Sequence, residues 1–196
     1  RKGIGADSRI GNKFLYPGCG YGGSCFPKDV KALIKTADKY GYSMSVLKAV
    51  ESVNEKQKTV LFEKLYNYYE GNLKGKTIAL WGLAFKPETD DMREATSLVT
   101  IKLLLKEGCK VVVYDPIAMQ ECMRRIGEVV TYANNMYDCV FNADALLLLT
   151  EWKIFRLPKW NVLKERMVVP LLIDGRNLYD HNEVISNGII YMSIGS

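Results

Sequence analysis

The sequence predicts an α/β fold in which a helical segment is followed by a doubly wound parallel sheet. The first observation is a change of pattern near residue 75, beyond which short uninterrupted apolar runs alternate with stretches of helical periodicity. Uninterrupted apolar strands are buried on both faces, which is typical of a parallel sheet covered by helices. The second observation is that apolar residues before this point recur at helical spacing.

The N-terminal part is expected to begin with a loop and to continue as two helices. Glycine and proline crowd residues 1–26, so this stretch forms an ordered loop only when it packs on something else. A helix is predicted from Pro27 with Gly41 as its stop, and a longer helix over residues 45–69. Two helices cannot enclose a core, so their apolar stripes should be buried against a partner subunit or another domain.

After a glycine-rich boundary at residues 71–76, strands and helices alternate. Strands are predicted at 77–81, 111–114, 145–149 and 170–173, and helices at 96–106, 119–126, 137–142 and 161–166. This order predicts a Rossmann-like domain over residues 75–196, preceded by a helical region over residues 1–74. Such a sheet binds its ligand beyond the carboxyl ends of its strands. The segments 82–94, 150–152 and 174–176 are placed there, the last of them after the final predicted strand.

Composition and charge exclude several classes of protein. The net charge is +5, and the basic residues are scattered among acidic ones, which argues against a nucleic-acid-binding stripe. No apolar run is long enough to span a bilayer, so no membrane partner is expected, and no signal peptide is recognisable at the N-terminus.

The cysteines and the histidine narrow the chemistry further. Five cysteines without CxxC spacing suit reduced thiols in the cytoplasm better than a disulfide framework or a zinc site. His181 is the only histidine, which argues against Ser-His-Asp catalysis and against multi-histidine metal sites. It is expected to be exposed and not to act as a base for a cysteine. No metal site is predicted.

Cys25 is the candidate nucleophile. Glycines crowd the residues before it and allow a substrate to approach the backbone closely, and Pro27 predicts a helix directly after it. The positive end of that helix and the Lys28 cation favour a thiolate, which is the nucleophilic form. The carboxylate of Asp29 is placed to orient a water or accept a proton. The alternative is a buried free cysteine beside a flexible turn, which this combination of residues disfavours.

Residues 18–23 formally fit the GxGxxG pattern of dinucleotide-binding loops, but the context is wrong. That pattern requires a strand before it and a helix that opens inside it. Here Pro17 precedes the glycines, and the predicted helix begins only at Pro27. The turn after the strand at 77–81 carries only Gly82 of the three glycines. No segment of the sequence is therefore predicted to be a standard NAD-binding half.

The segment 82–94 carries the other candidate binding residues. Phe85 and Lys86 place an aromatic face beside a cation, which suits a base and its phosphates, although a plain polar loop is the alternative. Arg176 follows a strand, where a guanidinium suits hydroxyls and phosphate; otherwise it is a surface arginine.

Five segments, in order, resemble the UDP-glucose/GDP-mannose dehydrogenase family: 5–15, 20–29, 82–94, 150–152 and 174–176. The resemblance is strongest to members that act on UDP-glucose. It implies two Rossmann-like domains joined by a helical dimerisation core, of which this chain matches the end of the core and the second domain. The first domain, with its NAD-binding glycines and its acid–base residues, is then expected to lie outside this chain.

The resemblance implies an NAD-dependent, four-electron oxidation of UDP-glucose to UDP-glucuronate in a homodimer or higher homo-oligomer. Cys25 attacks the aldehyde-level intermediate to give a thiohemiacetal and then a thioester, which water hydrolyses. Asp29 helps to position that water and Lys28 supports the charge around the site. A thioester keeps the carbonyl activated between oxidation and hydrolysis.

The resemblance also implies contacts. Substrate contacts are Arg9 (reaching across to another subunit), Tyr16, Pro17, Gly18, Cys19, Gly20, Tyr21, Gly22, Phe85, Lys86 and Arg176, and cofactor contacts are Phe26, Lys28 and Arg93, the last toward NAD of a neighbouring subunit.

Three alternatives stay open at this point. Dehydrogenases of GDP-mannose or UDP-N-acetylmannosamine share the same plan. The chain could instead be an inactive sugar-nucleotide-binding and dimerisation module. An unrelated cysteine-dependent transferase would need a second base, and the sequence offers none.

Overall fold

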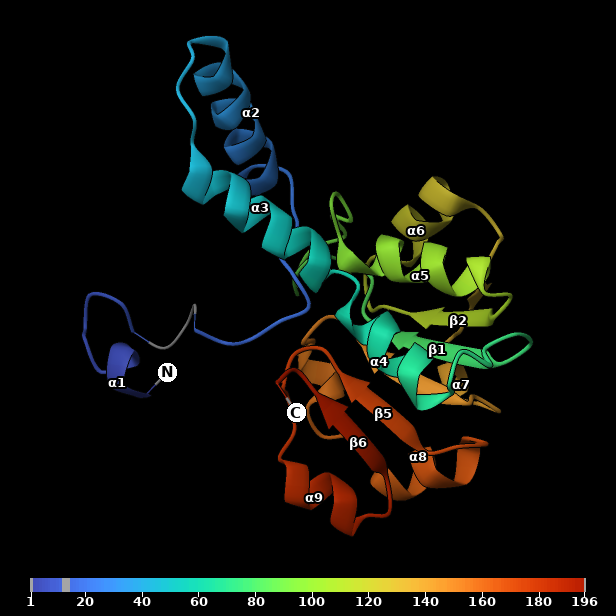
Figure 1. The fold of residues 1–196 in the computed structure, drawn as a ribbon. Coiled ribbons are helices and arrows are strands. Elements are labelled where there is room, and N and C mark those ends of the chain that lie inside the picture. Colours follow the sequence, from blue (N-terminus) through green and yellow to red (C-terminus); the bar gives the residue numbers. More distant parts are fainter. Residues whose placement is uncertain (1, 12–14, 196) are drawn as a thin grey trace.

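The computed structural model describes residues 2–11 and 15–195. Its centre is a parallel sheet with the strand order β3-β2-β1-β4-β5-β6 (Figure 1). The strands are β1 (Thr77–Trp81), β2 (Lys110–Tyr114), β3 (Thr131–Tyr132), β4 (Ala145–Leu148), β5 (Leu171–Asp174) and β6 (Ile190–Ser193). This is the order of a doubly wound dinucleotide-binding fold. The predicted fold class is therefore confirmed.

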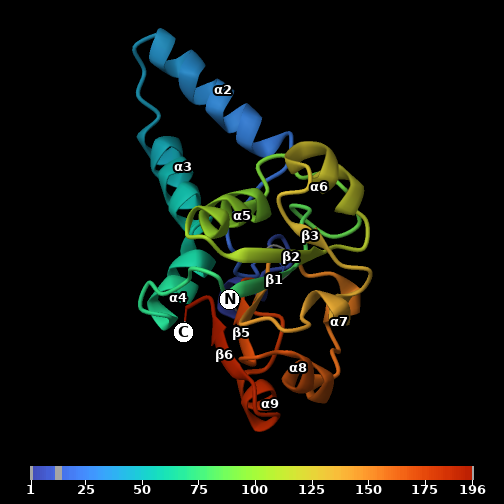
Figure 2. The same ribbon diagram turned by 90° about the vertical axis from the view of Figure 1, so that its right-hand side faces the viewer.

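Helices cover both faces of the sheet. They are α4 (Val60–Tyr68), α5 (Thr96–Lys106), α6 (Met119–Ile126), α7 (Met136–Cys139), α8 (Trp160–Arg166) and α9 (His181–Ser186), with a short 3₁₀ turn, η1 (Lys153–Phe155). One buried cluster joins α4, α5 and α6 to the sheet, and a second joins α7, α8 and α9 to its opposite face. Figure 2 shows α4 and α7 on opposite sides of the strands.

Two strands, β3 and β6, were not predicted. Both lie at the edges of the sheet. β3 is only two residues long, too short to produce an apolar run. β6 lies in the apolar run of residues 189–192, which the prediction overlooked. Because β6 follows β5, the segment 174–176 does not come after the final strand, as predicted, but after β5, inside the sheet. The helix predicted at 137–142 is the shorter α7, which ends at Cys139.

The single helix predicted over residues 45–69 is two helices. α3 spans Ser45–Gln57 with Lys58 as its C-cap, and α4 begins at Val60. At the break, the Thr59 hydroxyl donates to the Lys56 carbonyl at 2.7 Å. The break redirects the chain, because α3 points away from the sheet while α4 lies on it (Figure 1). Neither glycine nor proline marks this point in the sequence, so helical spacing alone could not reveal it.

α4 shares the core of the sheet. Leu61 and Leu65 are fully buried and belong to the cluster that contains α5. α4 lies before the predicted boundary between residues 74 and 75, yet it packs against strands that follow this boundary. The boundary stays a prediction.

We expect Leu65→Ala to lower the free energy of unfolding by about 2–5 kcal/mol, because it leaves a cavity under α4. The exposed Asn67 on the same helix provides the control, since Asn67→Ala should change that free energy by only about 0.5 kcal/mol. Urea unfolding followed by circular dichroism measures both. Equal small effects would contradict the packing of α4 on the sheet.

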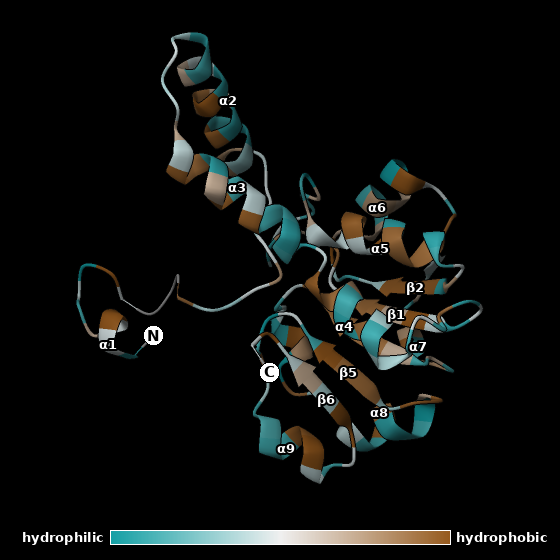
Figure 3. Ribbon diagram, in the orientation of Figure 1, coloured by the Kyte–Doolittle hydropathy of each residue, from teal (hydrophilic) through white to brown (hydrophobic). Residues whose placement is uncertain are grey.

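The helices α2 (Phe26–Lys39) and α3 project from the sheet domain as a pair (Figure 1). Only Pro27 is buried on α2 and only Asn54 on α3, while apolar side chains such as Leu33 and Val46 are exposed. Figure 3 shows this apolar character along both helices. α1 (Lys2–Gly5) lies apart from the sheet domain in Figure 1.

Within residues 2–11 and 15–195, no helix combines the length and the apolar character that crossing a bilayer requires.

Candidate functional site

A cavity of about 1330 Å³ opens beside the carboxyl ends of β1, β4 and β5. Three loops that follow these strands form one wall, α3 forms another, and the glycine-rich loop before α2 runs between them. The lining residues are Tyr16, Gly18, Gly20, Tyr21, Gly22, Phe26, Val46, Ala49, Val50, Val53, Asn54, Gln57, Phe85, Lys86, Glu151, Arg156, Arg176, Asn177 and Leu178. The cavity therefore lies where a doubly wound sheet binds its ligand.

The loop 82–94 is held in place by the buried Asp115 at the end of β2. One carboxylate oxygen of Asp115 accepts hydrogen bonds from the backbone N–H of Leu83 at 2.7 Å and of Ala84 at 3.2 Å. The hydroxyl of Thr150, which follows β4, donates to the Ala84 carbonyl at 2.6 Å. These contacts present Phe85 and Lys86 to the cavity, with the Lys86 ammonium 5.3 Å from the centre of the Phe85 ring.

Arg176 is positioned by the turn after β5. The Asp174 side chain accepts from the backbone N–H of Arg176 at 2.8 Å and of Leu178 at 2.7 Å. Burial raises the pKa of Asp174, although these hydrogen bonds act in the opposite direction. The guanidinium of Arg176 donates to Glu151 at 2.6 Å and rests against Gly18, where an added Cβ would lie 2.7 Å from Nη1. A side chain at position 18 would therefore displace the guanidinium of Arg176.

The glycine-rich loop is clamped between α3 and the loop 82–94. Asn54 on α3 accepts from the N–H of Tyr21 at 2.8 Å and donates to its carbonyl at 3.2 Å. On the other side, the N–H of Gly23 donates to the Arg93 carbonyl at 2.8 Å. A Cβ added at Gly22 would lie 2.5 Å from the Glu94 carbonyl oxygen. The two loops therefore touch directly, backbone to backbone.

Cys25 lies at the N-terminus of α2 with an exposed side chain, 3.5 Å from the hydroxyl of Ser24. The next residue, Phe26, lines the cavity and meets the Tyr21 ring edge-on at 4.8 Å. The guanidinium of Arg93 forms two hydrogen bonds with Asp91, which raise the pKa of Arg93, and Cys25 is among the groups that interact with it electrostatically. Cys25 therefore directly precedes the lining residue Phe26, and the Arg93 carbonyl accepts from Gly23 of the same loop.

Some of the predicted site residues line the cavity and others do not. Among the lining residues are Tyr16, Gly18, Gly20, Tyr21, Gly22, Phe26, Phe85, Lys86 and Arg176. Cys25, Lys28 and Asp29 are exposed beside the cavity but do not line it.

Three other predicted contacts lie elsewhere. Cys19 is buried beneath the loop, and burial raises the pKa of its thiol. Pro17 is exposed and does not line the cavity. Arg9 is exposed near α1 and pairs with Asp7. Residues 12–14 of the segment 5–15 lie outside the described residues. All these roles stay predictions.

Sequence reasoning missed Glu151, Arg156, Asn177 and Leu178, together with the wall that α3 provides. Glu151 belongs to the segment 150–152, which was noticed but set aside. Its partner Arg176 was the signal that could have identified it. The wall of α3 has no motif, because Val50 and Val53 are typical of any amphipathic helix.

The sheet does not fit a dinucleotide cofactor at its first turn. A Cβ added at Gly82 would lie 2.4 Å from the Thr150 side chain, so the turn is already filled. The second oxygen of Asp115 accepts from the N–H of Ile117 and Ala118, and the first also accepts from Trp152. A dinucleotide-binding fold uses an acid at this place to bind a ribose, whereas both oxygens of Asp115 already accept hydrogen bonds from the protein.

The described part of the chain contains no cluster of three histidine, cysteine or acidic side chains suited to a metal ion. All five cysteines are free.

Comparison with known proteins supports the resemblance. The UDP binding domain of the UDP-glucose/GDP-mannose dehydrogenase family matches residues 79–181, which is more than half of the chain, and the central domain of that family matches residues 1–56. The chain belongs to the UDP-glucose/GDP-mannose dehydrogenase family.

Relatives within the UDP-glucose/GDP-mannose dehydrogenase family extend beyond this chain. A UDP-glucose 6-dehydrogenase from Pseudomonas aeruginosa is 50% identical over 100% of this chain and 44% of its own length. One from Rhizobium meliloti is 42% identical over 99% of this chain and 44% of its own. The chain spans less than half the length of these relatives.

Solved structures agree with this family assignment. A UDP-glucose dehydrogenase from Pyrobaculum islandicum superposes with a TM-score of 0.84 at 32% identity, over 97% of this chain and 41% of that one. An NDP-N-acetyl-D-galactosaminuronic acid dehydrogenase from Methanosarcina mazei gives the same TM-score at 28% identity, over 100% of this chain and 43% of that one.

Proposed function

We propose that this chain is the nucleotide-sugar-binding and thiol-bearing part of an enzyme that oxidises UDP-glucose to UDP-glucuronate. The observation that carries the proposal is the contact between the loop before Cys25 and the loop that presents Phe85 and Lys86. This contact supports the proposal because it holds the loop before Cys25 beside a cavity that is lined with aromatic and cationic side chains. The 50% identity to a UDP-glucose 6-dehydrogenase supports the choice of sugar.

The nucleotide is proposed to bind between Phe85, Lys86 and Arg176. An aromatic ring stacks on a base, and two cations offset the charge of a diphosphate. The glycines that line the cavity leave room for the sugar ring beside the backbone.

In the proposed reaction, the sulfur of Cys25 attacks the C6 aldehyde carbon and forms a thiohemiacetal. Once C6 has reached the oxidation level of a thioester, water attacks this carbon. The C–S bond then breaks, the Cys25 thiolate leaves, and the carboxylate of UDP-glucuronate forms. Asp29 orients the attacking water, and the cation of Lys28 stabilises the negative oxygen that develops. Both side chains stand in the first turn of the helix that Cys25 precedes.

The cofactor of the proposed reaction is NAD, which accepts hydride from C6. Because the sheet of this chain does not fit a dinucleotide, we propose that Phe26, Lys28 and Arg93 make only peripheral contacts with NAD. Phe26 and Arg93 flank the Cys25 loop, and all three side chains are exposed.

The assembly is proposed to be a homodimer or a larger homo-oligomer that forms through α2 and α3. These helices expose apolar side chains that no part of the described chain covers, and such patches typically mark interfaces. Arg9 would then reach the substrate site of another subunit. Five free cysteines favour the cytoplasm as the compartment of the enzyme.

A panel of nucleotide sugars tests the proposed substrate. We expect UDP-glucose to bind with the lowest dissociation constant, ahead of UDP-N-acetylmannosamine and GDP-mannose, in calorimetric titrations of this chain. Tighter binding of GDP-mannose would replace the proposed substrate by that alternative. Absence of binding by all three would contradict the cavity as a nucleotide site.

The alternative of a binding module without activity is tested on the same chain. We expect no NADH absorbance when the chain is mixed with UDP-glucose and NAD, because Gly82 and Asp115 leave no dinucleotide site on its sheet. NADH formation by the pure chain would contradict this account of the sheet. Turnover by the complete enzyme separates the proposed dehydrogenase from an inactive module.

A further inference from the structure

The carboxylate of Glu94 binds two lysines from two different helices. Its Oε1 accepts from the Lys31 ammonium of α2 at 3.1 Å, and its Oε2 accepts from the Lys58 ammonium at the end of α3 at 3.0 Å. Glu94 itself is the last residue of the loop 82–94, which presents Phe85 and Lys86. We call the set Lys31, Lys58 and Glu94 the clasp. It connects both projecting helices to the nucleotide loop.

Lys58 is the buried member of the clasp, with 3% of its side chain exposed. A buried cation is stable only when it is paired. Burial acts to lower the pKa of Lys58, but its hydrogen bonds to Glu55 and Glu94 outweigh burial and leave the pKa raised. Glu55 lies on the same helix as Lys58, so Glu94 is the partner that crosses from α3 to the other loop.

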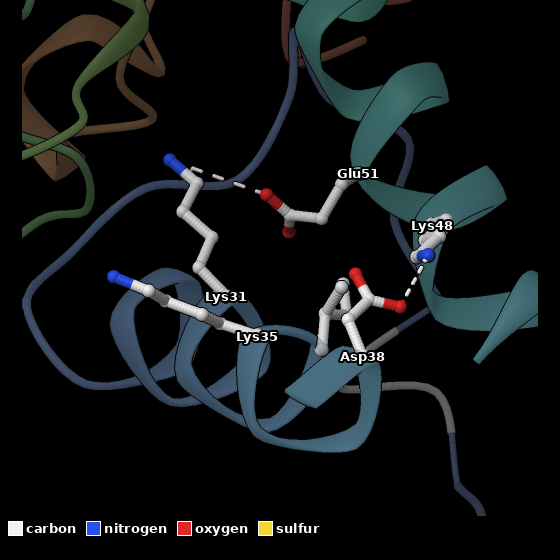
Figure 4. Close-up of a pocket in the computed structure, with 6 residues that line it drawn as sticks. Lys31, Lys35, Asp38, Lys48 and Glu51 are labelled. Carbon is white, nitrogen blue, oxygen red and sulfur yellow. Dashed lines mark hydrogen bonds and ion pairs between the residues drawn. The ribbon is translucent and has the colours of Figure 1, made fainter. Parts of the chain in front are cut away.

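Lys31 extends the connection toward Cys25. It lies on α2, the helix that Cys25 precedes, and it also approaches Glu51 of α3 at 4.0 Å. Figure 4 shows Lys31 and Glu51 pointing toward each other across the space between the two helices. Glu51 in turn accepts a hydrogen bond from the Tyr21 hydroxyl in the glycine-rich loop. The same set of charges therefore connects α2, α3 and the glycine-rich loop.

The backbone of Glu94 is the surface against which the thiol-bearing loop rests. A Cβ at Gly22 would collide with the Glu94 carbonyl oxygen. The neighbouring Arg93 carbonyl accepts a hydrogen bond from the N–H of Gly23. Glu94 has a φ of 54°, a left-handed conformation that is unusual for a residue other than glycine. Such a conformation persists only where surrounding contacts hold it, and the clasp supplies contacts of this kind.

We propose that Glu94, held by Lys31 and Lys58, is a positioning residue that couples nucleotide binding at Phe85 and Lys86 to the placement of Cys25. The proposal rests on the function proposed above. When a nucleotide binds at Phe85 and Lys86 and shifts the loop 82–94, Glu94 moves with it, and both the glycine-rich loop and α2 follow through the contacts just described. Glu94 is not expected to touch the reacting atoms.

The test measures alkylation of Cys25 by iodoacetamide in the complete enzyme, with and without saturating UDP, by mass spectrometry of the Cys25 peptide. UDP fills the nucleotide part of the site and carries no sugar that could cover the thiol. We expect UDP to slow alkylation of the unsubstituted enzyme by about fivefold or more. We expect Glu94→Gln, which keeps the shape but removes the charge, to abolish this effect.

Glu55→Gln is the matched control, because it removes the other carboxylate on the Lys58 ammonium without touching the nucleotide loop. It should keep the effect of UDP on alkylation. Lys31→Met, which leaves Glu94 its bond from Lys58 and Glu51 its hydrogen bond from Tyr21, should weaken the effect, and Lys58→Arg should retain it. The dissociation constant of UDP should change by only about twofold in all four variants.

Two outcomes would overturn the proposal, and they differ. Full protection of Cys25 by UDP from alkylation in both Glu94→Gln and Lys31→Met would show that the clasp only stabilises the fold. Failure of UDP to bind the unsubstituted enzyme would overturn the nucleotide site and the coupling with it. Bound UDP without any change in alkylation of the unsubstituted enzyme would overturn the coupling alone.

Discussion

Replacing Cys25 by alanine is expected to abolish formation of UDP-glucuronate in the complete enzyme. Loss of a covalent nucleophile lowers turnover by about 10³-fold or more, because the groups that act with it have nothing left to activate. The affinity for UDP-glucose should barely change, since Cys25 does not line the cavity and Phe85, Lys86 and Arg176 are untouched. Product formation is measured by chromatography and affinity by titration.

Two further variants sharpen this test. Cys25→Ser should accumulate labelled enzyme, because an oxygen ester lacks the activation that a thioester gives the carbonyl. Ser24→Ala is the matched control, since its hydroxyl lies 3.5 Å from the thiol and is the other nucleophile in reach. It should keep nearly full turnover. Full turnover by Cys25→Ala together with loss in Ser24→Ala would move the nucleophile to Ser24.

The strands that support the site could be predicted from the sequence because they lie inside the sheet. β1, β4 and β5 are apolar along almost their whole length, since both of their faces are covered by helices. The edge strand β3 could not be found in this way, because two residues are too few to form a pattern. The edge strand β6 could have been found from the apolar run of residues 189–192, but the prediction overlooked it. The cavity depends on the inner strands, so its position could be predicted although two strands were missed.

Residues with a distinctive local context could be predicted, and residues that act only through tertiary contacts could not. Phe85 and Arg176 stand beside strand ends, where a pattern of neighbours marks them. Asn54 has no such context, because its role depends on hydrogen bonds to Tyr21, which is 33 positions away. The same holds for Lys58, which the sequence shows as one charge in the polar middle of a predicted helix and the structure shows as a buried cation.

The break between α3 and α4 has the same origin. Leu61 and Leu65 continue the helical spacing of α3, so the local pattern predicts one helix. The chain bends at Lys58 and Thr59 because the sheet offers a buried surface for α4, while the Lys58 ammonium is held by Glu94. Tertiary burial outweighs local helical preference here.

Arg176→Ala and Lys86→Ala should both weaken the binding of UDP-glucose, but to different extents. Lys86 is exposed, and it forms no ion pair with any described residue. Its loss therefore removes one charge-assisted contact with the nucleotide of about 1.5 kcal/mol, or roughly tenfold in the dissociation constant. Arg176 is paired with Glu151 at 2.6 Å. Its removal leaves that carboxylate facing the diphosphate, so the expected loss is about 3 kcal/mol, or roughly 100-fold.

The role of Glu151 separates lost attraction from new repulsion. One of its oxygens is already buried without a hydrogen-bond partner among the described residues, so the carboxylate depends on Arg176 for compensation. The double variant Arg176→Ala/Glu151→Gln should therefore bind UDP-glucose about tenfold more tightly than Arg176→Ala alone, because the repulsive charge is gone while the missing cation is not restored. Isothermal titration of the single and double variants measures the difference. Equal affinities of the two would show that Glu151 does not face the phosphates, and unchanged affinity in both Lys86→Ala and Arg176→Ala would reduce the loops after β1 and β5 to ordinary surface loops.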